Sequence, residues 1–261
     1  MSIKISAVIP VKNEEARIHR CLDALKGWVD EIIIVDDHSD DRTVAIARQQ
    51  YGAKVITQAL DNDWSKQRNT GAVVSSNDWI LQLDADEVVP PQTARMIQDV
   101  LSQGGQAKAY TLTRVNALFD KLLYHCGSGE VLRLYDRRQA VWEGPVHEQL
   151  RVRGDVTKIA AFIEHYPVAS IEYFLAKNLS YAKVTASQFL HKTQSLDLKK
   201  IRHGLTFKAL KLFWKSYVRK KGYKDGIQGL CWCVLLVITA QIFWLTILQK
   251  AHDDQIPSSR T

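Results

Sequence analysis

Two aspartates one residue apart, Asp84 and Asp86, follow an apolar run at residues 79–83 that is typical of a buried strand. Hard divalent cations such as Mg²⁺ and Mn²⁺ prefer oxygen ligands, and they often take only one or two carboxylates together with phosphate oxygens. Carboxylates at the point where a strand opens into a loop therefore suit a cation that carries a substrate diphosphate. Acidic pairs are also common in ordinary loops, so this pattern needs support from the rest of the chain.

Apolar runs and helical periodicity alternate through the N-terminal part of the chain and predict strands and helices. Asn13 is the expected cap of the first helix. Strand–helix alternation with short loops predicts a mostly parallel sheet with right-handed crossovers, flanked by helices. The predicted strands cover residues 5–11, 31–35, 54–56, 79–83, 110–113 and 131–135, and the predicted helices cover 18–29, 43–50, 65–74, 92–101 and 172–192.

Three polar features fall at the carboxyl ends of predicted strands: Pro10-Val11, Asp36-Asp37 and residues 84–86. Ligands of open α/β sheets bind at this edge, where the strand order reverses. The sequence therefore predicts a single ligand site built from these three strand ends.

The length and the cysteine content limit the kind of protein this chain can be. Its 261 residues suffice for one large α/β domain with additions, or for two small domains. The four cysteines match neither a zinc pattern nor a secreted disulfide framework, and the first residues do not resemble a secretory signal. These features predict reduced thiols in a cytoplasmic compartment.

Positive charge is concentrated in one basic segment, residues 199–224. It contains ten lysines and arginines and no acidic residue, whereas the whole chain carries a formal charge of +7. The remainder of the chain is therefore slightly acidic. This distribution argues against a general nucleic-acid-binding protein and for a local electrostatic patch.

The following segment, residues 226–249, contains no formally charged residue. Its 24 residues are enough to cross a bilayer at about 1.5 Å per residue, although Gln and Thr residues dilute it and a buried or interfacial helical hairpin is the alternative. A basic stretch beside an apolar segment that contains tryptophan favours attachment to an anionic membrane surface, with a solvated helix and an ordinary core helix as the competing interpretation. We expect an N-terminal domain over residues 1–195 and a helical, membrane-associating segment over residues 196–261.

Four motifs follow one another along the chain: AVIPVKNEE at 7–15, IIVDDHSDDRT at 33–43, KQRN at 66–69 and WILQLDADE at 79–87. Taken in order, they resemble those of a family 2 glycosyltransferase of the GT-A fold. Two later segments, residues 132–135 and 146–148, are similar to the subgroup that contains the lipopolysaccharide core β-1,4-glucosyltransferases acting on heptose. The resemblance covers residues 3–180 and implies a GT-A, Rossmann-like α/β fold with a helical C-terminal tail.

The resemblance implies how a nucleotide-sugar donor is held. Pro10 and Asp37 would hold the nucleotide base, since a carboxylate can accept the N3–H of uracil. Asp36 would brace the loop, and a helix-capping role for the Asp36-Asp37 pair is compatible with both functions. Glu14 would contact the ribose or the base, with a first-turn acid favoured by the helix dipole as the alternative.

The third and fourth motifs would hold the diphosphate. Arg68 faces it in the family pattern, where a guanidinium grips phosphate oxygens in bidentate fashion. Asp86 is the expected ligand of Mg²⁺ or Mn²⁺, and Asp84 would bind the sugar or ribose hydroxyls, or the metal through water. Glu87 could assist in metal or donor binding, but a solvated loop acid is the preferred interpretation.

His147 and Glu148 complete the expected site. By resemblance His147 would be a further metal ligand, better suited to Mn²⁺ than to Mg²⁺ because imidazole is a softer donor. This superfamily typically inverts the anomeric centre, and Glu148 is the expected base that takes the proton of the acceptor hydroxyl. Many members carry a Glu-Asp base pair that is absent here after Asp86, so Glu130 and Glu143 are alternatives.

The resemblance thus implies a metal-dependent, inverting hexosyltransferase, and the basic and apolar segments favour the cytoplasmic face of the inner membrane. The enzyme would move a hexose, with glucose as the first choice, from a UDP-sugar to a glycolipid or heptose-containing acceptor of the lipopolysaccharide core or another envelope glycan. A non-catalytic membrane-bound partner with the same fold is the alternative, which the intact Asp84, Asp86 and Arg68 disfavour. A nucleotidyltransferase ranks lower, because its phosphate loop would need a glycine that residues 11–15 lack.

Overall fold

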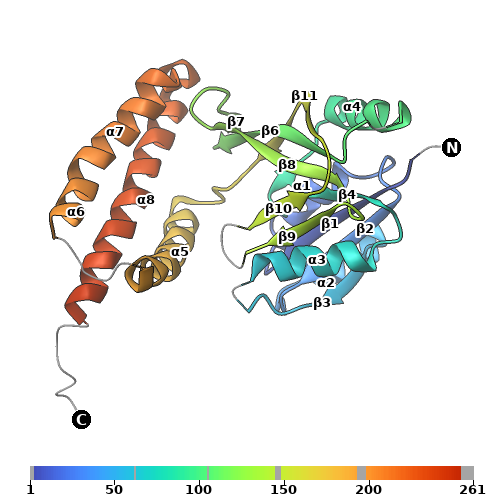
Figure 1. The fold of residues 1–261 in the computed structure, drawn as a ribbon, viewed down its shortest axis with the longest axis horizontal. Coiled ribbons are helices and arrows are strands. Elements are labelled where there is room, and N and C mark those ends of the chain that lie inside the picture. The colour runs from blue at the N-terminus through green and yellow to red at the C-terminus, as the bar shows by residue number, and fades with distance from the viewer. Residues whose placement is uncertain (1–2, 62, 105, 145–147, 193–197, 254–261) are drawn as a thin grey trace, which may run out of the picture. The chain divides into compact units, whose positions relative to one another are not determined.

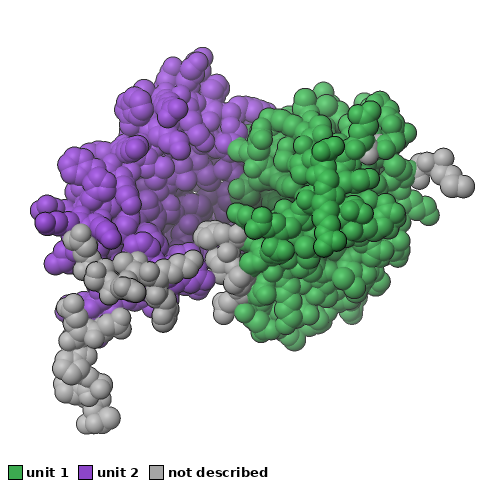
Figure 2. All heavy atoms as spheres, viewed as in Figure 1, with its two compact units in different colours: residues 1–115, 129–165 green, residues 116–128, 166–261 purple. Residues whose placement is uncertain are grey.

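The computed structural model describes residues 3–61, 63–104, 106–144, 148–192 and 198–253 (Figure 1). The chain forms two compact units, which Figure 2 colours separately. Unit 1 comprises residues 1–115 and 129–165, and unit 2 comprises residues 116–128 and 166–261. The chain therefore passes between the units at three places, and the expected domain division at residue 195 stays a prediction.

Unit 1 is built on a mixed sheet whose first half is parallel (Figure 1). The strands are β1 Ile5–Val11, β2 Glu31–Asp36, β3 Lys54–Thr57, β4 Trp79–Gln82, β5 Glu87–Val88, β6 Ala109–Leu118, β7 Lys121–Leu122, β8 Ser128–Asp136, β9 Ala140–Glu143, β10 Gln149–Val152 and β11 Val156–His165. The order is β3-β2-β1-β4-β8-β6-β11-β5, with β7 paired to β6 and a separate antiparallel pair of β9 and β10. The pairs among β1–β4 are parallel, and β4 meets β8 antiparallel.

Strands β1 to β4 confirm the strands predicted at residues 5–11, 31–35, 54–56 and 79–83. Every residue of β1 is buried, as expected for a strand covered on both faces. The strands predicted at 110–113 and 131–135 are the inner parts of the longer β6 and β8. The fold is therefore the predicted α/β class, with a mixed, mostly parallel sheet flanked by helices.

Helices α1 Ile18–Asp23, α2 Thr43–Tyr51, α3 Trp64–Val74 and α4 Pro91–Ser102 flank the sheet. The helix predicted over residues 18–29 starts at Ile18 as expected, but its predicted C-terminal end and its predicted cap are wrong. The helix ends at Asp23, and Asn13 does not cap it, because α1 begins after Arg17 and Asn13 has a φ of 53°. Leu25 is nevertheless fully buried, so turn residues rather than helical ones bring it into the core.

Helix α3 approaches the sheet as closely as a glycine allows. A Cβ at Gly71 would lie 2.3 Å from Cγ1 of Val8 on β1 and 2.9 Å from Cγ2 of Val35 on β2. No side chain fits at these separations, so the close approach requires glycine. Arg68 lies three residues before Gly71 and thus on the same helix face. The contact therefore helps to fix where Arg68 stands at the sheet edge.

Unit 2 consists mainly of packed helices. They are α5 Ile171–Lys192, α6 Leu198–His203, the π-helix η1 Gly204–Lys208, α7 Ala209–Phe213, the π-helix η2 Trp214–Arg219, the 3₁₀-helix η3 Gly222–Asp225 and α8 Gly226–Asp253. Helix α8 packs against α5, where ring centroids of Phe174 and Trp232 lie 6.3 Å apart and those of Phe189 and Trp244 lie 5.9 Å apart. The predicted helix at 172–192 and the helical C-terminal segment are confirmed.

The end of β6, the short β7 and the first residue of β8, together residues 116–128, belong to unit 2. Asp225, buried just before α8, accepts backbone N–H groups from His125 at 3.1 Å and Cys126 at 2.9 Å. It also meets Nδ1 of His125 at 2.8 Å. This carboxylate joins residues 116–128 to the start of α8. The four cysteines are free thiols, as predicted.

Candidate active site

The carboxyl ends of β1, β2 and β4 meet at one edge of the parallel half of the sheet. Val11 pairs with Asp36 across β1 and β2, and Val8 pairs with Gln82 across β1 and β4. Parallel pairing therefore brings the three polar strand ends to the same edge, as the sequence predicts.

Asp84 is the centre of a charge network at this edge. Its Oδ1 accepts a hydrogen bond from Nη2 of Arg68 at 2.8 Å, and its Oδ2 accepts one from Nη2 of Arg133 at 2.9 Å. Arg133 also donates from Nε and Nη2 to the two carboxylate oxygens of Glu87, at 2.9 and 2.7 Å. Glu87 in turn accepts the backbone N–H of Asp84 at 3.1 Å. Arginines from α3 and β8 thus fix both oxygens of one aspartate.

The two guanidinium groups also determine the protonation of Asp84. Burial would raise the pKa of this carboxyl, but the positive charges of Arg68 and Arg133 outweigh burial and hold the pKa well below its usual value. Asp84 is therefore ionised at neutral pH. Cys21, whose Sγ lies 3.8 Å from the backbone oxygen of Asp84, has a pKa raised by burial and by the nearby acids, so it stays a neutral thiol.

Arg68 is buried and shared between two acids. Its side chain is 6% exposed, and its Nε donates to Oε1 of Glu148 at 3.1 Å. The guanidinium carbon lies 5.0 Å from the ring centroid of Trp142. Its Nη1 is buried and has no hydrogen-bond acceptor in the described part of the chain. Because a buried N–H without an acceptor is costly, this atom indicates a place for an anionic ligand.

Glu87 is not the solvated loop acid that its sequence position suggests. It is fully buried, and Nη1 of Arg114 lies 3.7 Å from its Oε1 in addition to the two hydrogen bonds from Arg133. A buried carboxylate requires compensating charge, and Arg133 provides it. The interpretation was wrong because the burial of Glu87 depends on a partner 46 residues later in the chain.

Asp86 is buried beside a histidine and an arginine. Its Oδ1 lies 3.4 Å from Nε2 of His165, at the end of β11, and its Oδ2 lies 3.7 Å from Nη1 of Arg17. Arg17 also donates to both carboxylate oxygens of Glu14, at 2.8 and 2.7 Å. Glu14 therefore engages Arg17 in this structure, and its contact with a donor stays a prediction.

The expected base-binding residues Pro10 and Asp37 lie at the ends of β1 and β2. Asp36 accepts the backbone N–H of Ser39 at 3.1 Å and braces the loop, as predicted. Oδ1 of Asp37 accepts the backbone N–H of Leu60 at 2.9 Å. Its Oδ2 accepts no hydrogen bond from the described residues, so one carboxylate oxygen is left for a ligand.

A metal ion at this edge would have few protein ligands. Within the described ranges, no group of three or more metal-ligating side chains is present. Asp86 and His165 nevertheless form an oxygen–nitrogen pair of the kind that Mn²⁺ accepts. The expected ligand His147 lies outside the described residues. Because Mg²⁺ and Mn²⁺ often complete their coordination with substrate phosphates, the donors present fit a cation that arrives with a diphosphate.

Of the three acids considered as the base, Glu148 contacts the charge network through Arg68. Glu130 and Glu143 are 59% and 57% exposed and form ion pairs with exposed basic side chains. Neither has a described contact with the network. The structure thus places Glu148, Arg68 and Asp84 together and leaves the two alternatives at the surface.

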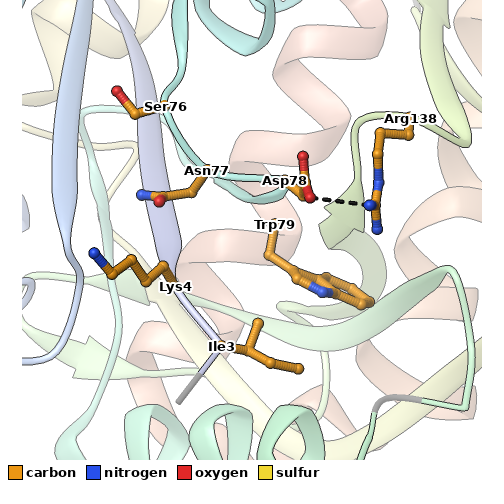
Figure 3. A pocket seen from close by; sticks show the side chains of 7 residues that line it. All are labelled: Ile3, Lys4, Ser76, Asn77, Asp78, Trp79 and Arg138. Atoms are coloured by element: carbon orange, nitrogen blue, oxygen red, sulfur yellow. Dashed lines mark ion pairs between the residues drawn. The ribbon is translucent and has the colours of Figure 1, made fainter. Parts of the chain in front are cut away.

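A separate pocket of about 360 Å³ lies at the amino ends of β1 and β4 (Figure 3). Its walls include Lys4, Asn77 and Arg138, and Arg138 pairs with Asp78 at 3.0 Å. This end of a parallel sheet is opposite to the edge at which ligands bind. None of the expected site residues lines this pocket.

Three residues of the charge network escaped the sequence reasoning. Arg133 lies between Leu132 and Leu134 in an apolar strand, and a charge in such a position signals a buried partner. Arg17 directly precedes Ile18, and the sequence motifs assign it no role. His165 ends β11, a strand whose alternating exposure gives a weak signal of its own.

Comparison with known proteins agrees with the geometry of this edge. The sequence model of glycosyl transferase family 2 matches residues 6–142, which include the three strand ends, Arg68 and the acids at 84–87. The chain belongs to glycosyl transferase family 2, and the predicted family is confirmed.

Relatives in this family include proteins that match nearly the whole chain. An uncharacterized glycosyltransferase from Rickettsia felis is 30% identical over 241 residues, which cover 87% of this chain and 83% of the relative. The lipopolysaccharide core biosynthesis glycosyltransferase LpsC of Rhizobium meliloti is 23% identical over 270 residues, covering 97% of this chain and 96% of LpsC. Among solved structures, glucosyl-3-phosphoglycerate synthase from Mycobacterium tuberculosis, in complex with Mn²⁺, UDP and glucosyl-3-phosphoglycerate, is similar over 44% of each chain, with 24% identity and a TM-score of 0.37.

Proposed function

We propose that this family 2 glycosyltransferase moves a hexose, with glucose as the first candidate, from a UDP-sugar to a glycolipid acceptor of the lipopolysaccharide core or another envelope glycan. The buried Nη1 of Arg68 carries the proposal, because it has no acceptor among the described residues and stands beside Asp84. A donor diphosphate supplies the missing acceptor. In a non-catalytic partner protein the contacts of Arg68 with Asp84 and Glu148 would remain, but its buried Nη1 would have no ligand to bind.

The donor is held along the strand ends. Pro10 and Asp37 bind the nucleotide base, with the unoccupied Oδ2 of Asp37 as the acceptor for an N–H of the base. Glu14 contacts the ribose or the base of the donor. Asp84 is 31% exposed and ionised, so it can accept hydrogen bonds from sugar or ribose hydroxyls while both arginines hold it.

Glu148 is the base of the transfer. It takes the proton of the acceptor hydroxyl while the acceptor oxygen bonds to the anomeric carbon and the bond to UDP breaks on the opposite face, which inverts the configuration. The 3.1 Å contact between Glu148 and Nε of Arg68 supports a place for Glu148 in the site, whereas the two alternative acids lie at the surface.

Asp86 and His147 would hold Mg²⁺ or Mn²⁺, with the nitrogen of His165 at 3.4 Å from Asp86 as a described neighbour. A cation held there would supply positive charge against the diphosphate. The buried carboxylate of Asp86 beside the imidazole of His165 supports a cation at this place, and the part of His147 rests on the family resemblance. Metal dependence is tested directly by removing the cation with a chelator and restoring it.

The acceptor is proposed to be membrane-held, at the cytoplasmic face of the inner membrane. The basic segment supports this, and so does the one helix in the described ranges, residues 222–253, that is long and apolar enough to cross a membrane by length and composition. The similarity to LpsC, named for lipopolysaccharide core biosynthesis, agrees with an envelope acceptor. The chain is expected to attach either peripherally or through its C-terminal apolar helix.

A donor screen tests the proposal. The purified chain is incubated with nucleotide sugars, Mn²⁺ or Mg²⁺ and a heptose-containing core glycolipid, and UDP release is measured. We expect release from UDP-glucose that depends on the acceptor. No release with any donor, together with no UDP binding by calorimetry, refutes the proposal.

Two variants test the base. Glu148→Gln should keep UDP binding and lose about 10²- to 10⁴-fold in transfer rate. Glu143→Gln removes an exposed acid of the same kind and should leave the rate unchanged. An unchanged rate in the Glu148 variant would refute its role as the base.

A further inference from the structure

The continuous segment from α6 to η2, residues 198–219, exposes a row of large apolar side chains. Phe207, Leu210, Trp214 and Val218 are 66%, 69%, 57% and 45% exposed. Spacings of three and four residues place them along one face of the segment. An exposed apolar row of this kind marks an interaction surface, and tryptophan is enriched where a membrane meets water.

Basic side chains accompany this apolar row. Lys208, Lys211, Lys215 and Arg219 each follow one of its members by a single residue, and all four are exposed. Lysine and arginine lay their stems along apolar surface while their charged ends reach polar surroundings. An apolar face bordered by positive charge, in a segment without acids, complements the headgroups and the acyl boundary of an anionic bilayer.

Helix α8 satisfies the length and composition of a membrane span, yet only part of its surface is open. Its exposed side chains Ile227, Val234, Ile238 and Leu245 recur at spacings of seven and four residues and share one face. Its other side packs against α5 and against the segment from α6 to η2. A helix that crosses a bilayer alone is apolar on all sides and contacts only lipid. Helix α8 contacts other helices along part of its surface, so it does not fit this description.

The helices that pack on α8 carry too much charge to accompany it through a bilayer. Nε2 of Gln241 donates to the backbone oxygen of Leu205 at 2.7 Å. A Cβ at Gly204 would meet the ring of Trp244 at 2.2 Å, and Nζ of Lys208 lies 4.8 Å from the centroid of that ring. These contacts hold Lys208 beside Trp244 of α8, away from the ends of the helix. A spanning α8 would draw Lys208 towards hydrocarbon, where charged side chains are strongly disfavoured.

We propose that unit 2 lies on the surface of an anionic bilayer through the face of Phe207, Leu210, Trp214 and Val218, and that α8 is the core helix of this unit and does not cross the membrane. Charge complementarity selects lipid as the occupant. A second copy of the chain would present the same ten basic residues and repel the first. The inference rests on the proposed membrane location, but lipid binding is measured without sugar transfer, so each can fail alone.

Co-sedimentation of the full chain with vesicles tests the surface. We expect binding to phosphatidylcholine vesicles that contain phosphatidylglycerol, weak binding without it, and release by salt. Replacing Lys211, Lys215 and Arg219 by glutamine should weaken binding roughly 100-fold, from the summed attraction of three charges to anionic lipid. Replacing Phe207, Leu210 and Trp214 by serine should also weaken it, because the apolar contact is lost.

A matched control replaces Val141 and Val156 by serine. These residues are 48% and 46% exposed in unit 1, and the variant should bind vesicles like the unchanged chain. Circular dichroism establishes that each variant is folded. Undiminished vesicle binding by either unit 2 variant overturns the proposal. The proposal is also overturned if the unchanged chain does not bind anionic vesicles but forms dimers that the serine variant does not form. That result would show that the apolar face serves self-association.

A reporter peptide fused to the C-terminus shows whether α8 crosses the membrane or stays on one side of it. If α8 does not cross, protease added outside bacterial spheroplasts should leave the reporter intact, and protease added to inverted membrane vesicles should cleave it. Cleavage from outside the spheroplasts and protection in the inverted vesicles would show a spanning α8 and overturn the proposal.

Discussion

The site edge of unit 1 and the basic segment of unit 2 use charge in opposite ways. In unit 1, Arg68, Arg133 and Glu87 are nearly or fully buried, and each is paired through short hydrogen bonds. In unit 2, basic side chains stand exposed beside exposed apolar ones. Buried pairs fix atoms at defined positions, as chemistry requires. Exposed charges suit binding to a surface without fixed shape. The comparison therefore separates charges that position atoms for chemistry from charges that attach the protein to a surface.

The largest effect is expected from breaking a buried pair. Arg133→Met leaves Glu87 charged and buried without its main partner, and we expect a loss of about 3–5 kcal/mol in the free energy of unfolding. Urea titration measures it. The double variant Arg133→Met with Glu87→Leu removes both charges and should recover most of the loss. A single variant as stable as the unchanged chain would contradict the role of the pair.

A somewhat smaller effect is expected where the charge is kept but its geometry changes. Arg68→Lys retains the positive charge and loses the planar fork that serves Asp84, Glu148 and a diphosphate together. We expect kcat/KM for sugar transfer to fall by about 10²-fold, with weaker UDP binding by calorimetry. Arg151→Lys, at an exposed ion pair of unit 1, is the matched control and should change neither quantity.

The pH dependence of stability probes Asp84. Because its pKa in the folded chain lies below the usual value of 3.8, its pairing stabilises the fold above that value and this contribution is lost as the pH falls through the lower, folded pKa. Asp84→Asn should therefore lower the free energy of unfolding by about 2 kcal/mol near neutral pH, and the difference should shrink in acid. Asp61→Asn, a 63% exposed control, should show little difference at either pH. A difference that persists unchanged in acid would contradict the assignment.

The smallest effect on stability is expected at the exposed face of unit 2. Trp214→Ser should change the free energy of unfolding by less than about 0.5 kcal/mol, because this side chain is largely in solvent. The control Trp232→Ala removes a buried ring of the same type and should cost about 3–5 kcal/mol. Thermal or urea unfolding measures both. Equal losses in the two variants would show that Trp214 belongs to the core.

The parallel half of the sheet is predictable from the sequence because its signals are local. Apolar runs and helical spacing specify β1 to β4 and α2 to α4 within short windows. β5 and β7 are only two residues long, and β9 and β10 only four, so their local signals are weak; the first half of β11 is largely exposed. The end of α1 is likewise set by packing, because Leu25 reaches the core from a turn.

Part of the site is also predictable, because its sequence signals are local. Asp84, Asp86 and Arg68 stand in contiguous motifs at strand ends or on the following helix. The contacts that fix them come from residues far along the chain, such as Arg133 on β8 and His165 on β11. Antiparallel pairing and register decide these neighbours, and no local pattern contains that information.

The chain passes between the two units at three places, and this limits how truncation or recombination of the gene can separate them. A gene shortened at codon 196 would keep residues 116–128, held between β6 and β8, while losing Asp225, which receives the N–H groups of His125 and Cys126. It would also uncover Leu118 and Leu123, which share a core with α8. Recombination at a single breakpoint therefore cannot separate the transferase unit from its helical companion. We therefore expect the two units to be inherited together as one module.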